Sequence, residues 1–237
     1  MSRKVVLWLS TVAVFALVVA YQTLGLSSAG RAGEFAVHAG MPRVHPGTDV
    51  LVNVVVLPQR LHRYDYHRLA FGDPWDDNND APLGNNGCDT REDILTRDLV
   101  DKTFVSIKRC PNAVATGTLH DPYTKKTVAF QRGAKVGESV QIDHIVPLAY
   151  AWDMGAYGWP QRQRLRFAND PANLLAVDGQ ANHDKSDSPP ARWMPPNAAF
   201  TCQYTMQFIA VLRGYQLPLD EPSTGVLRQA ATTCPTG

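Results

Sequence analysis

The chain has few cysteines and no excess of charge of either sign. Its 237 residues include four cysteines, 23 basic residues and 22 acidic residues, for a formal net charge of +1. A protein that coats nucleic acid through bulk charge is far more basic, so contact with a polyanion must depend on a local group of side chains. The chain also lacks internal repeats and low-complexity segments, and 44% of it is hydrophobic. This composition is typical of a globular protein and excludes a repeat array or a fully disordered chain.

No two of the four cysteines form a CxxC pair. They are Cys88, Cys110, Cys202 and Cys234. A zinc site built from four cysteines needs closely spaced pairs, so we do not expect one. Two disulfides are expected instead, in an oxidising compartment. Of the three possible connectivities we favour Cys88–Cys110 with Cys202–Cys234, because each bond then closes a loop of about twenty to thirty residues around a predicted helix.

The first thirty residues have the composition of an export signal. Arg3 and Lys4 precede an apolar run over residues 5–26, and small residues follow. This order predicts a signal peptide over residues 1–29, or an uncleaved anchor through residues 5–26. Either interpretation places the remaining chain outside the cytoplasm, secreted or on the outer face of the membrane. Removing residues 1–29 lowers the basic count from 23 to 21 against 22 acidic residues, so the exported part has a net charge of about −1.

The remaining chain is predicted as a Gly-, Ala- and Pro-rich tether over residues 30–49 and one domain over residues 50–237. Strands or hairpins are predicted at 50–58, 114–130, 140–146 and 172–177. Helices are predicted from Thr90 with a capping box to Asp93, from Pro147, at 160–170, at 178–187, at 199–215 and in the tail to Cys234. These elements alternate without βαβ regularity, so the expected fold class is α+β.

Three segments in the middle of the chain place polar residues within or beside apolar runs, where polar side chains are costly to bury. They read DHIVP at 143–147, PANLL at 171–175 and NHDKSD at 182–187. If they form strand, strand and helix, they bring Asp143, His144 and Asn182 around one point. Carboxylate and amide oxygens suit Mg²⁺ or Mn²⁺, and a neutral histidine beside such an ion can take a proton from water.

Basic side chains near these segments are candidates for binding the phosphates of a nucleic-acid backbone. We expect this role for Lys185, on the same predicted helix as Asn182, and for Arg162 and Arg166, on the helix predicted at 160–170, where Arg164 also lies. A solvated helix face is the alternative for the three arginines. Arg91 could reach the active site or pair with an acid of its own helix, and we favour the structural pair.

The segments resemble the ββα-metal motif of HNH endonucleases. The wider chain is similar to secreted HNH nucleases of actinobacteria, related to the C-terminal domain of GmrSD-type restriction endonucleases. The matching stretches are GCDTREDILTRDL, GTLHDPYTKK, DHIVPLAYAWDMGA and FANDPANLLAVDGQANHDKSDSPPARWMPPN. The resemblance covers roughly residues 60–234. It implies a ββα-metal core at about residues 138–188, embedded in a mostly helical single domain stapled by disulfides.

The resemblance also implies a role for each matching residue. His144 corresponds to the general base, and Asp143 to a metal ligand. Asn173 corresponds to the middle Asn of the catalytic motif, which braces the loop that orients the histidine. Asn182 corresponds to the second metal ligand, because its spacing to the following lysine matches the Asn-type variant. A shift of one residue would put His183 there instead.

The sequence therefore predicts an exported, metal-dependent endonuclease that hydrolyses phosphodiester bonds of DNA, with RNA as a second candidate substrate. Low sequence specificity is expected because nothing resembles a separate base-reading module, and a monomer is expected. Two alternatives stay open: an inactive HNH scaffold that binds nucleic acid or a partner at the envelope, and a metal with a purely structural role. The aromatic residues between 64 and 75 are expected in the core rather than as a base-stacking surface.

Overall fold

The computed structural model describes residues 41–133 and 139–236. The predicted signal or anchor and most of the predicted tether lie outside these residues. The part from residue 42 onward forms one compact unit of mixed helices and strands. No helix among the described residues is both long enough and apolar enough to cross a membrane.

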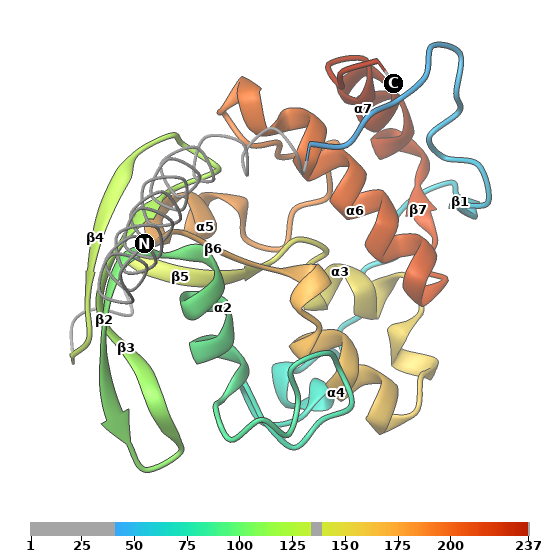
Figure 1. Ribbon diagram of the computed structural model, residues 1–237. Helices are drawn as coiled ribbons and strands as arrows, with labels where there is room; N and C mark the ends of the chain where they lie inside the picture. The colour runs from blue at the N-terminus through green and yellow to red at the C-terminus, as the bar shows by residue number, and fades with distance from the viewer. Residues whose placement is uncertain (1–40, 134–138, 237) are drawn as a thin grey trace, which may run out of the picture. The chain divides into compact units, whose positions relative to one another are not determined.

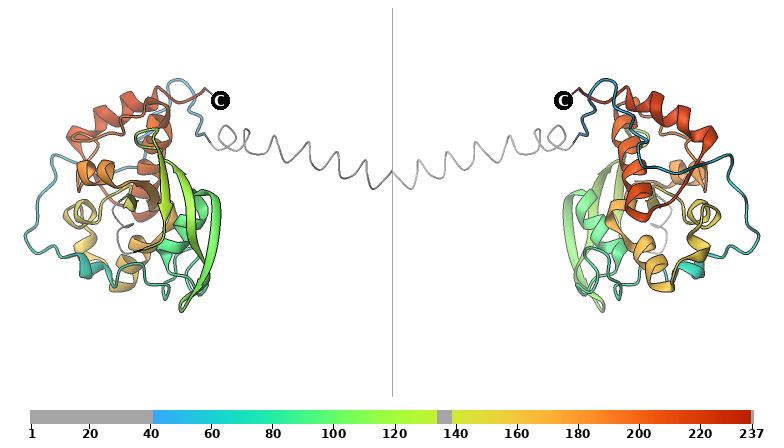
Figure 2. Two further views of the ribbon diagram at one scale, coloured as in Figure 1. Left: turned by 90° about the vertical axis from the view of Figure 1, so that its left-hand side faces the viewer. Right: turned by 90° about the vertical axis from the view of Figure 1, so that its right-hand side faces the viewer.

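A three-stranded antiparallel sheet forms one side of this unit (Figures 1 and 2). Its strands are β2 (Val100–Ile107), β3 (Cys110–His120) and β4 (Thr127–Gln131), with β3 in the middle. The predicted hairpin at 114–130 is confirmed as β3–β4. Strand β2 was not predicted, because nearly all of its side chains are exposed and it has no alternation of apolar and polar residues.

A second, two-stranded antiparallel sheet lies in the interior. It pairs β5 (Val140–His144) with β6 (Leu174–Asp178), and the helix α5 (Gly179–Lys185) follows β6 directly. Asp178 caps this helix, since its carboxylate accepts a hydrogen bond from the amide of Ala181 at 3.1 Å. The strands and the polar helix predicted for these segments are confirmed.

Two hydrophobic clusters flank the β5–β6 pair. One is formed by α2 (Thr90–Asp98) with β3, β4 and alternate residues of β5 and β6, namely Val140, Ile142, Leu174 and Ala176. The other contains α3 (Leu148–Asp153) and α4 (Gln161–Asn169) together with α6 (Thr201–Tyr215) and α7 (Glu221–Ala231). Short 3₁₀ helices complete the unit: η1 (Arg68–Phe71), η2 (Ala156–Gly158), η3 (Pro171–Asn173) and η4 (Ala198–Phe200). Polar side chains on β5 are thus held within a packed interior.

The strand predicted at 50–58 is mostly wrong. Only β1 (Val56–Leu57) is extended and paired, in parallel with β7 (Leu219–Asp220). The preceding residues form turns, in which the amide of Leu51 donates to the Asp49 carboxylate at 3.1 Å and Asn53 has a positive φ of 65°. Val50 is buried, whereas Val52 and Val55 are exposed, so the run lacks the alternating burial of a strand with one covered face.

Two boundaries also differ from prediction. Helix α2 is capped by Asp89, whose carboxylate accepts from the amide of Glu92 at 2.9 Å, and not by Thr90. The hydroxyl of Thr90 instead donates to Asn169 at 2.8 Å, which ties α2 to α4. The domain begins near residue 42 and not at residue 50, since Val44 donates to the carbonyl of Pro235 at 3.0 Å.

Both disulfides have the favoured pairing. Cys88–Cys110 joins the segment before α2 to β3, and Cys202–Cys234 joins α6 to the segment after α7. The bonds span 22 and 32 residues of sequence. All four cysteines are used, which excludes a cysteine-ligated metal.

Replacing Cys202 and Cys234 together by Ala should lower the free energy of unfolding by about 3–4 kcal/mol, because loss of the cross-link raises the entropy of the unfolded chain. Urea unfolding followed by tryptophan fluorescence measures this. The double Cys88→Ala/Cys110→Ala variant serves for comparison, and its slightly shorter loop predicts a similar loss. An unchanged midpoint in either variant would contradict the cross-link account.

Candidate functional site

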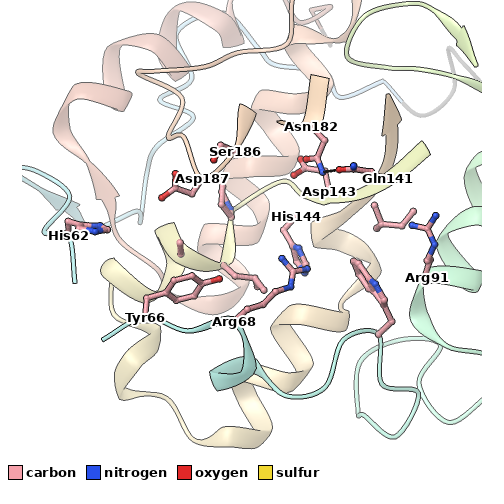
Figure 3. A pocket seen from close by; sticks show the side chains of 15 residues that line it. His62, Tyr66, Arg68, Arg91, Gln141, Asp143, His144, Asn182, Ser186 and Asp187 are labelled. Carbon is pink, nitrogen blue, oxygen red and sulfur yellow. Dashed lines mark hydrogen bonds between the residues drawn. The ribbon is translucent and has the colours of Figure 1, made fainter. Parts of the chain in front are cut away.

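The β5–α5 region lines a pocket of about 560 Å³ (Figure 3). Three of the predicted site residues lie in its wall: Asp143, His144 and Asn182. Two come from the end of β5 and the third from α5, so the strand–strand–helix order brings them together as expected from the sequence. Figure 3 shows Asn182, Asp143 and Gln141 side by side on one wall.

Asp143 is buried and held by two donors. Lys185 lies 2.9 Å from one carboxylate oxygen and donates to the other at 3.1 Å, and the hydroxyl of Tyr123 donates at 2.5 Å. Burial raises the pKa of Asp143, whereas the charge of Lys185 and the Tyr123 hydrogen bond lower it. Burial likewise lowers the pKa of Lys185, and the attraction of Asp143 opposes this. Each charge of the buried pair therefore favours the charged form of the other.

Lys185 does not occupy the position predicted for it. Its side chain is 0% exposed, and its ammonium also donates to the backbone carbonyl of His144 at 2.9 Å. All three ammonium donors of a lysine are then directed at groups of β5. The role of holding substrate phosphate does not fit this buried position. Lys185 connects the end of α5 to β5 instead.

Asn182 lies about one helical turn before Lys185 and faces the pocket. Its amide nitrogen donates to the side-chain oxygen of Gln141 at 2.7 Å, which leaves its amide oxygen available as a ligand. The alternative residue, His183, is exposed and is not among the residues that line the pocket. The geometry thus agrees with the preference for Asn182 at the third motif position.

His144 is buried between an aromatic ring and a backbone carbonyl. Its ring stacks on Trp75 with centroids 5.6 Å apart and planes 10° apart. Its Nε2 lies 2.9 Å from the carbonyl oxygen of Ala168. Because a carbonyl can only accept, Nε2 carries the hydrogen of the neutral ring and Nδ1 keeps a lone pair. The second ring nitrogen is therefore in the state that a general base requires.

The surroundings keep this ring neutral. Burial, followed by the nearby positive charge of Arg68, lowers the pKa of His144 from its ordinary value of 6.5 to about 3. The hydrogen bond to Ala168 opposes this shift and is the weaker effect. At neutral pH the imidazole is thus unprotonated and free to accept a proton.

Asn173 lies outside the pocket and is completely buried. Its side-chain oxygen accepts from the amide of Val146 at 2.8 Å, and its amide nitrogen donates to the carbonyl of the same residue at 3.2 Å. Its backbone carbonyl accepts from Ile145 at 2.8 Å. These bonds hold the two residues that follow His144, so Asn173 acts on the histidine through the backbone.

The arginines of α4 are not part of the pocket. Arg162 is exposed and pairs with Asp80 at 2.9 Å, and Arg166 is exposed near Tyr215. Arg164 donates to the backbone carbonyls of Ala70 and Trp159. The expectation that Arg162 and Arg166 hold substrate phosphates at the site is therefore not supported, and a helix face with structural pairs describes them better.

Two other arginines line the pocket. Arg68 comes from η1 and lies beside His144, and Arg91 comes from α2 on the other side (Figure 3). Arg91 donates to the carbonyl of Val140 at 3.1 Å, and neither arginine forms an ion pair with a residue that the structure describes. The sequence analysis favoured a structural pair for Arg91 over a place at the site, and the pocket agrees with the less favoured alternative. It missed Arg68 because the stretch around that residue has no clear period.

Two of these side chains could serve a hard divalent cation that keeps part of its water shell. Asp143 and Asn182 offer one carboxylate and one amide oxygen, and a carboxylate that accepts three hydrogen bonds still has a free lone pair. No group of three or more His, Cys, Asp or Glu side chains within residues 41–133 and 139–236 could enclose a metal. Water and phosphate oxygens would therefore have to supply most ligands, as is common for Mg²⁺.

Comparison with known proteins identifies the family. Residues 89–221 match the family described as GmrSD restriction endonucleases, C-terminal domain, and the chain belongs to this family. The chain is also similar to an uncharacterized secreted protein of Arthroderma benhamiae, with 35% identity over 150 residues that cover 62% of this chain and 68% of that protein. No solved structure matches the chain.

The family match has clear limits within the fold. It begins at the cap of α2 and ends at the start of α7, so it contains β5, β6 and α5. Arg91 lies inside it, whereas Arg68 and Trp75 precede it. The pocket therefore combines residues of the family domain with residues that come before it.

Replacing Lys185 by Met should lower the free energy of unfolding by about 3–5 kcal/mol, because Asp143 then loses its buried counter-charge. Lys126→Met is the matched control. Lys126 is 61% exposed and lies 3.8 Å from Asp178, so its loss should cost less than about 1 kcal/mol. Urea unfolding in EDTA compares the two variants. Equal losses in the free energy of unfolding would show that the buried pair stabilises the fold no more than an exposed one.

Proposed function

We propose that this protein is an exported, metal-dependent endonuclease that hydrolyses phosphodiester bonds of nucleic acid, DNA in particular. The observation that carries the proposal is a neutral His144, with Nδ1 unprotonated, in one pocket with Asp143, Asn182 and two arginines. The family's description as restriction endonucleases supports this class of reaction. The two disulfides and the secreted relative fit export.

In this proposal β5, β6 and α5 are the ββα-metal core of an HNH nuclease, at about residues 138–188. Asp143 and Asn182 would hold Mg²⁺ or Mn²⁺, which would stabilise the negative charge on the leaving oxygen. His144 takes a proton from the attacking water at Nδ1, while Ala168 holds the hydrogen on Nε2. Trp75 fixes the plane of the ring.

Arg68 and Arg91 take the role first expected of Lys185, Arg162 and Arg166. Both line the pocket, and both have guanidinium groups without an acidic partner among the described residues. A guanidinium matches the geometry of a phosphate and binds it through two parallel hydrogen bonds. A scissile phosphate between them would lie close to His144.

A second candidate function is a binding protein on an inactive scaffold. The observation that favours it is the close engagement of Asp143 by Lys185 and Tyr123, which neutralises the carboxylate without a metal ion. A binder, however, has no need of a histidine with one ring nitrogen left unprotonated. A purely structural metal is less favoured still, because two disulfides and two hydrophobic clusters already stabilise the unit.

Supercoiled plasmid incubated with the purified, oxidised protein should be nicked with Mg²⁺ or Mn²⁺ and stay intact in EDTA. His144→Ala should reduce the rate by roughly 10²–10⁴-fold, because the general base is lost. The variant should keep the wild-type melting temperature to within a few degrees, which separates catalysis from folding. Wild-type protein that leaves both plasmid and an RNA control intact with every ion would reject the enzyme and favour the binding scaffold.

Arg91→Gln should reduce kcat/KM by roughly 10- to 100-fold, the value expected for loss of one charged hydrogen bond to phosphate. Arg162→Gln is the matched control, since its exposed pair with Asp80 lies outside the pocket. Initial rates of plasmid nicking at several substrate concentrations give both values. If kcat/KM falls further in Arg162→Gln than in Arg91→Gln, the arginines of α4 and not those of the pocket bind the phosphate.

A further inference from the structure

A segment before the family match forms one wall of the pocket. We call residues 60–68 the strap; it runs from the segment after β1 to the start of η1. Three strap side chains line the pocket: His62, Tyr66 and Arg68 (Figure 3). The strap thus contributes to the site although nothing in the sequence motif includes it.

The strap is fixed to α3 by hydrogen bonds. The buried carboxylate of Asp153 accepts from Arg60 Nε at 2.6 Å and from the backbone amide of Arg63 at 2.8 Å. The indole of Trp152 donates to Asp65 at 2.9 Å. The middle of the strap is therefore held in a defined conformation, and the side chains it displays are pre-positioned.

Tyr64 is displayed outward from this fixed backbone. Its side chain is 96% exposed, and its ring meets the edge of the His62 ring at a centroid distance of 5.4 Å. The expectation that the aromatic residues of this region are core residues holds for Phe71, which is buried, and is wrong for Tyr64. An aromatic ring held in water next to a polar pocket offers a flat face for another ring.

A second pocket of about 600 Å³ adjoins the first, since His62 and Asp187 line both. Two carboxylates line this pocket, and neither is left free to repel an anion. Asp187 pairs with Arg60 at 2.6 Å, and Asp220 is buried and accepts hydrogen bonds from Tyr150 and Ser223.

Arg192 is the exposed cation of this second pocket, and it forms no ion pair with a residue in the described part of the chain. The second pocket is thus suited to a negative group. His62 lines both pockets, and the ring of Tyr64 touches the ring of His62, so the three features meet at this residue.

We propose that a single strand of nucleic acid runs from the first pocket past His62 into the second, with one base stacked on Tyr64 and a phosphate at Arg192. This inference rests on the proposed function and names its substrate class. A base in a duplex has both faces covered by its neighbours, so only an unpaired base can stack on Tyr64. Aromatic platforms beside cationic grooves bind single strands in this way.

The charge of the protein agrees with this choice. The part after residue 29 has a net charge of about −1, so its overall charge gives no general attraction to the phosphates of a duplex. Stacking supplies affinity without bulk charge. The strap also precedes residues 89–221, so the proposed strand preference depends on residues outside the match to the family.

Fluorescence anisotropy with the oxidised full-length protein in EDTA tests the proposal without cleavage. The probes are a labelled oligonucleotide of about a dozen nucleotides, which covers one site, and the duplex of the same sequence. The single strand should bind at least about tenfold more tightly than the duplex. Tyr64→Ala should weaken single-strand binding by roughly 5- to 100-fold, and Tyr64→Phe should restore it, because stacking needs the ring and not the hydroxyl.

Phe104→Ala is the matched control, because Phe104 is an aromatic residue 51% exposed on β2 and lines neither pocket. It should leave both affinities unchanged. Arg192→Gln should lower the salt dependence of single-strand binding by about one phosphate contact, with a smaller effect on duplex.

Equal affinity for both probes, or equal effects of Tyr64→Ala and Phe104→Ala, would overturn the inference. These outcomes are separate from the fate of the enzyme proposal. If nicking depends on His144 but Tyr64→Ala binds the single strand as tightly as wild type, the proposed enzyme is kept and the strand path is rejected. If the wild-type protein binds the single strand but cleaves nothing, and Tyr64→Ala loses this binding, the strand path is kept and the enzyme is rejected.

Discussion

The buried pair of Lys185 and Asp143 is the contact on which the arrangement of the site depends. It joins the end of α5 to the end of β5, in a place where either charge alone would be costly. Lys185 also binds the carbonyl of His144, so one ammonium group holds two successive residues of the strand. Because Asn182 lies about one turn earlier on the same helix, this contact places it beside Asp143 and Gln141. The positions of Asp143 and Asn182 thus depend on the buried ammonium group of Lys185.

The environment of His144 shows how a protein of near-zero net charge can hold a buried histidine neutral and in one tautomer. Burial and the charge of Arg68 keep the imidazole unprotonated, while Ala168 fixes the tautomer and Trp75 fixes the ring. None of these effects requires a large overall charge. The proposed substrate path likewise needs no broad basic surface. It depends on Arg68, Arg91 and Arg192, which form no ion pair with a described residue, and on the exposed ring of Tyr64.

The family domain and the strap contribute different parts of the pocket. Residues 89–221 contain β5, β6, α5 and Arg91, which carry the proposed chemistry. The strap precedes this range, and it is attached to the domain through Asp153 of α3. A relative that keeps the domain and changes the strap would keep the same reaction on a different form of nucleic acid, if both proposals hold.

The sequence by itself determined the local features. Period-2 alternation marked β5, turn residues marked the start of α5, and cysteine positions gave the correct pairing of both disulfides. The motif also brought Asp143, His144 and Asn182 to one pocket. These features depend on residues close together in the chain, or on one resemblance that includes them all.

Only the tertiary structure decided which charged and aromatic side chains are buried. Lys185 reads as a surface lysine and is enclosed, whereas Tyr64 reads as a core residue and is exposed. Arg68 and Arg91 reach the pocket from η1 and α2, while the more obvious arginines of α4 do not. The physical reason is that burial depends on which distant segments pack against a face, and the local pattern of a segment does not record its neighbours.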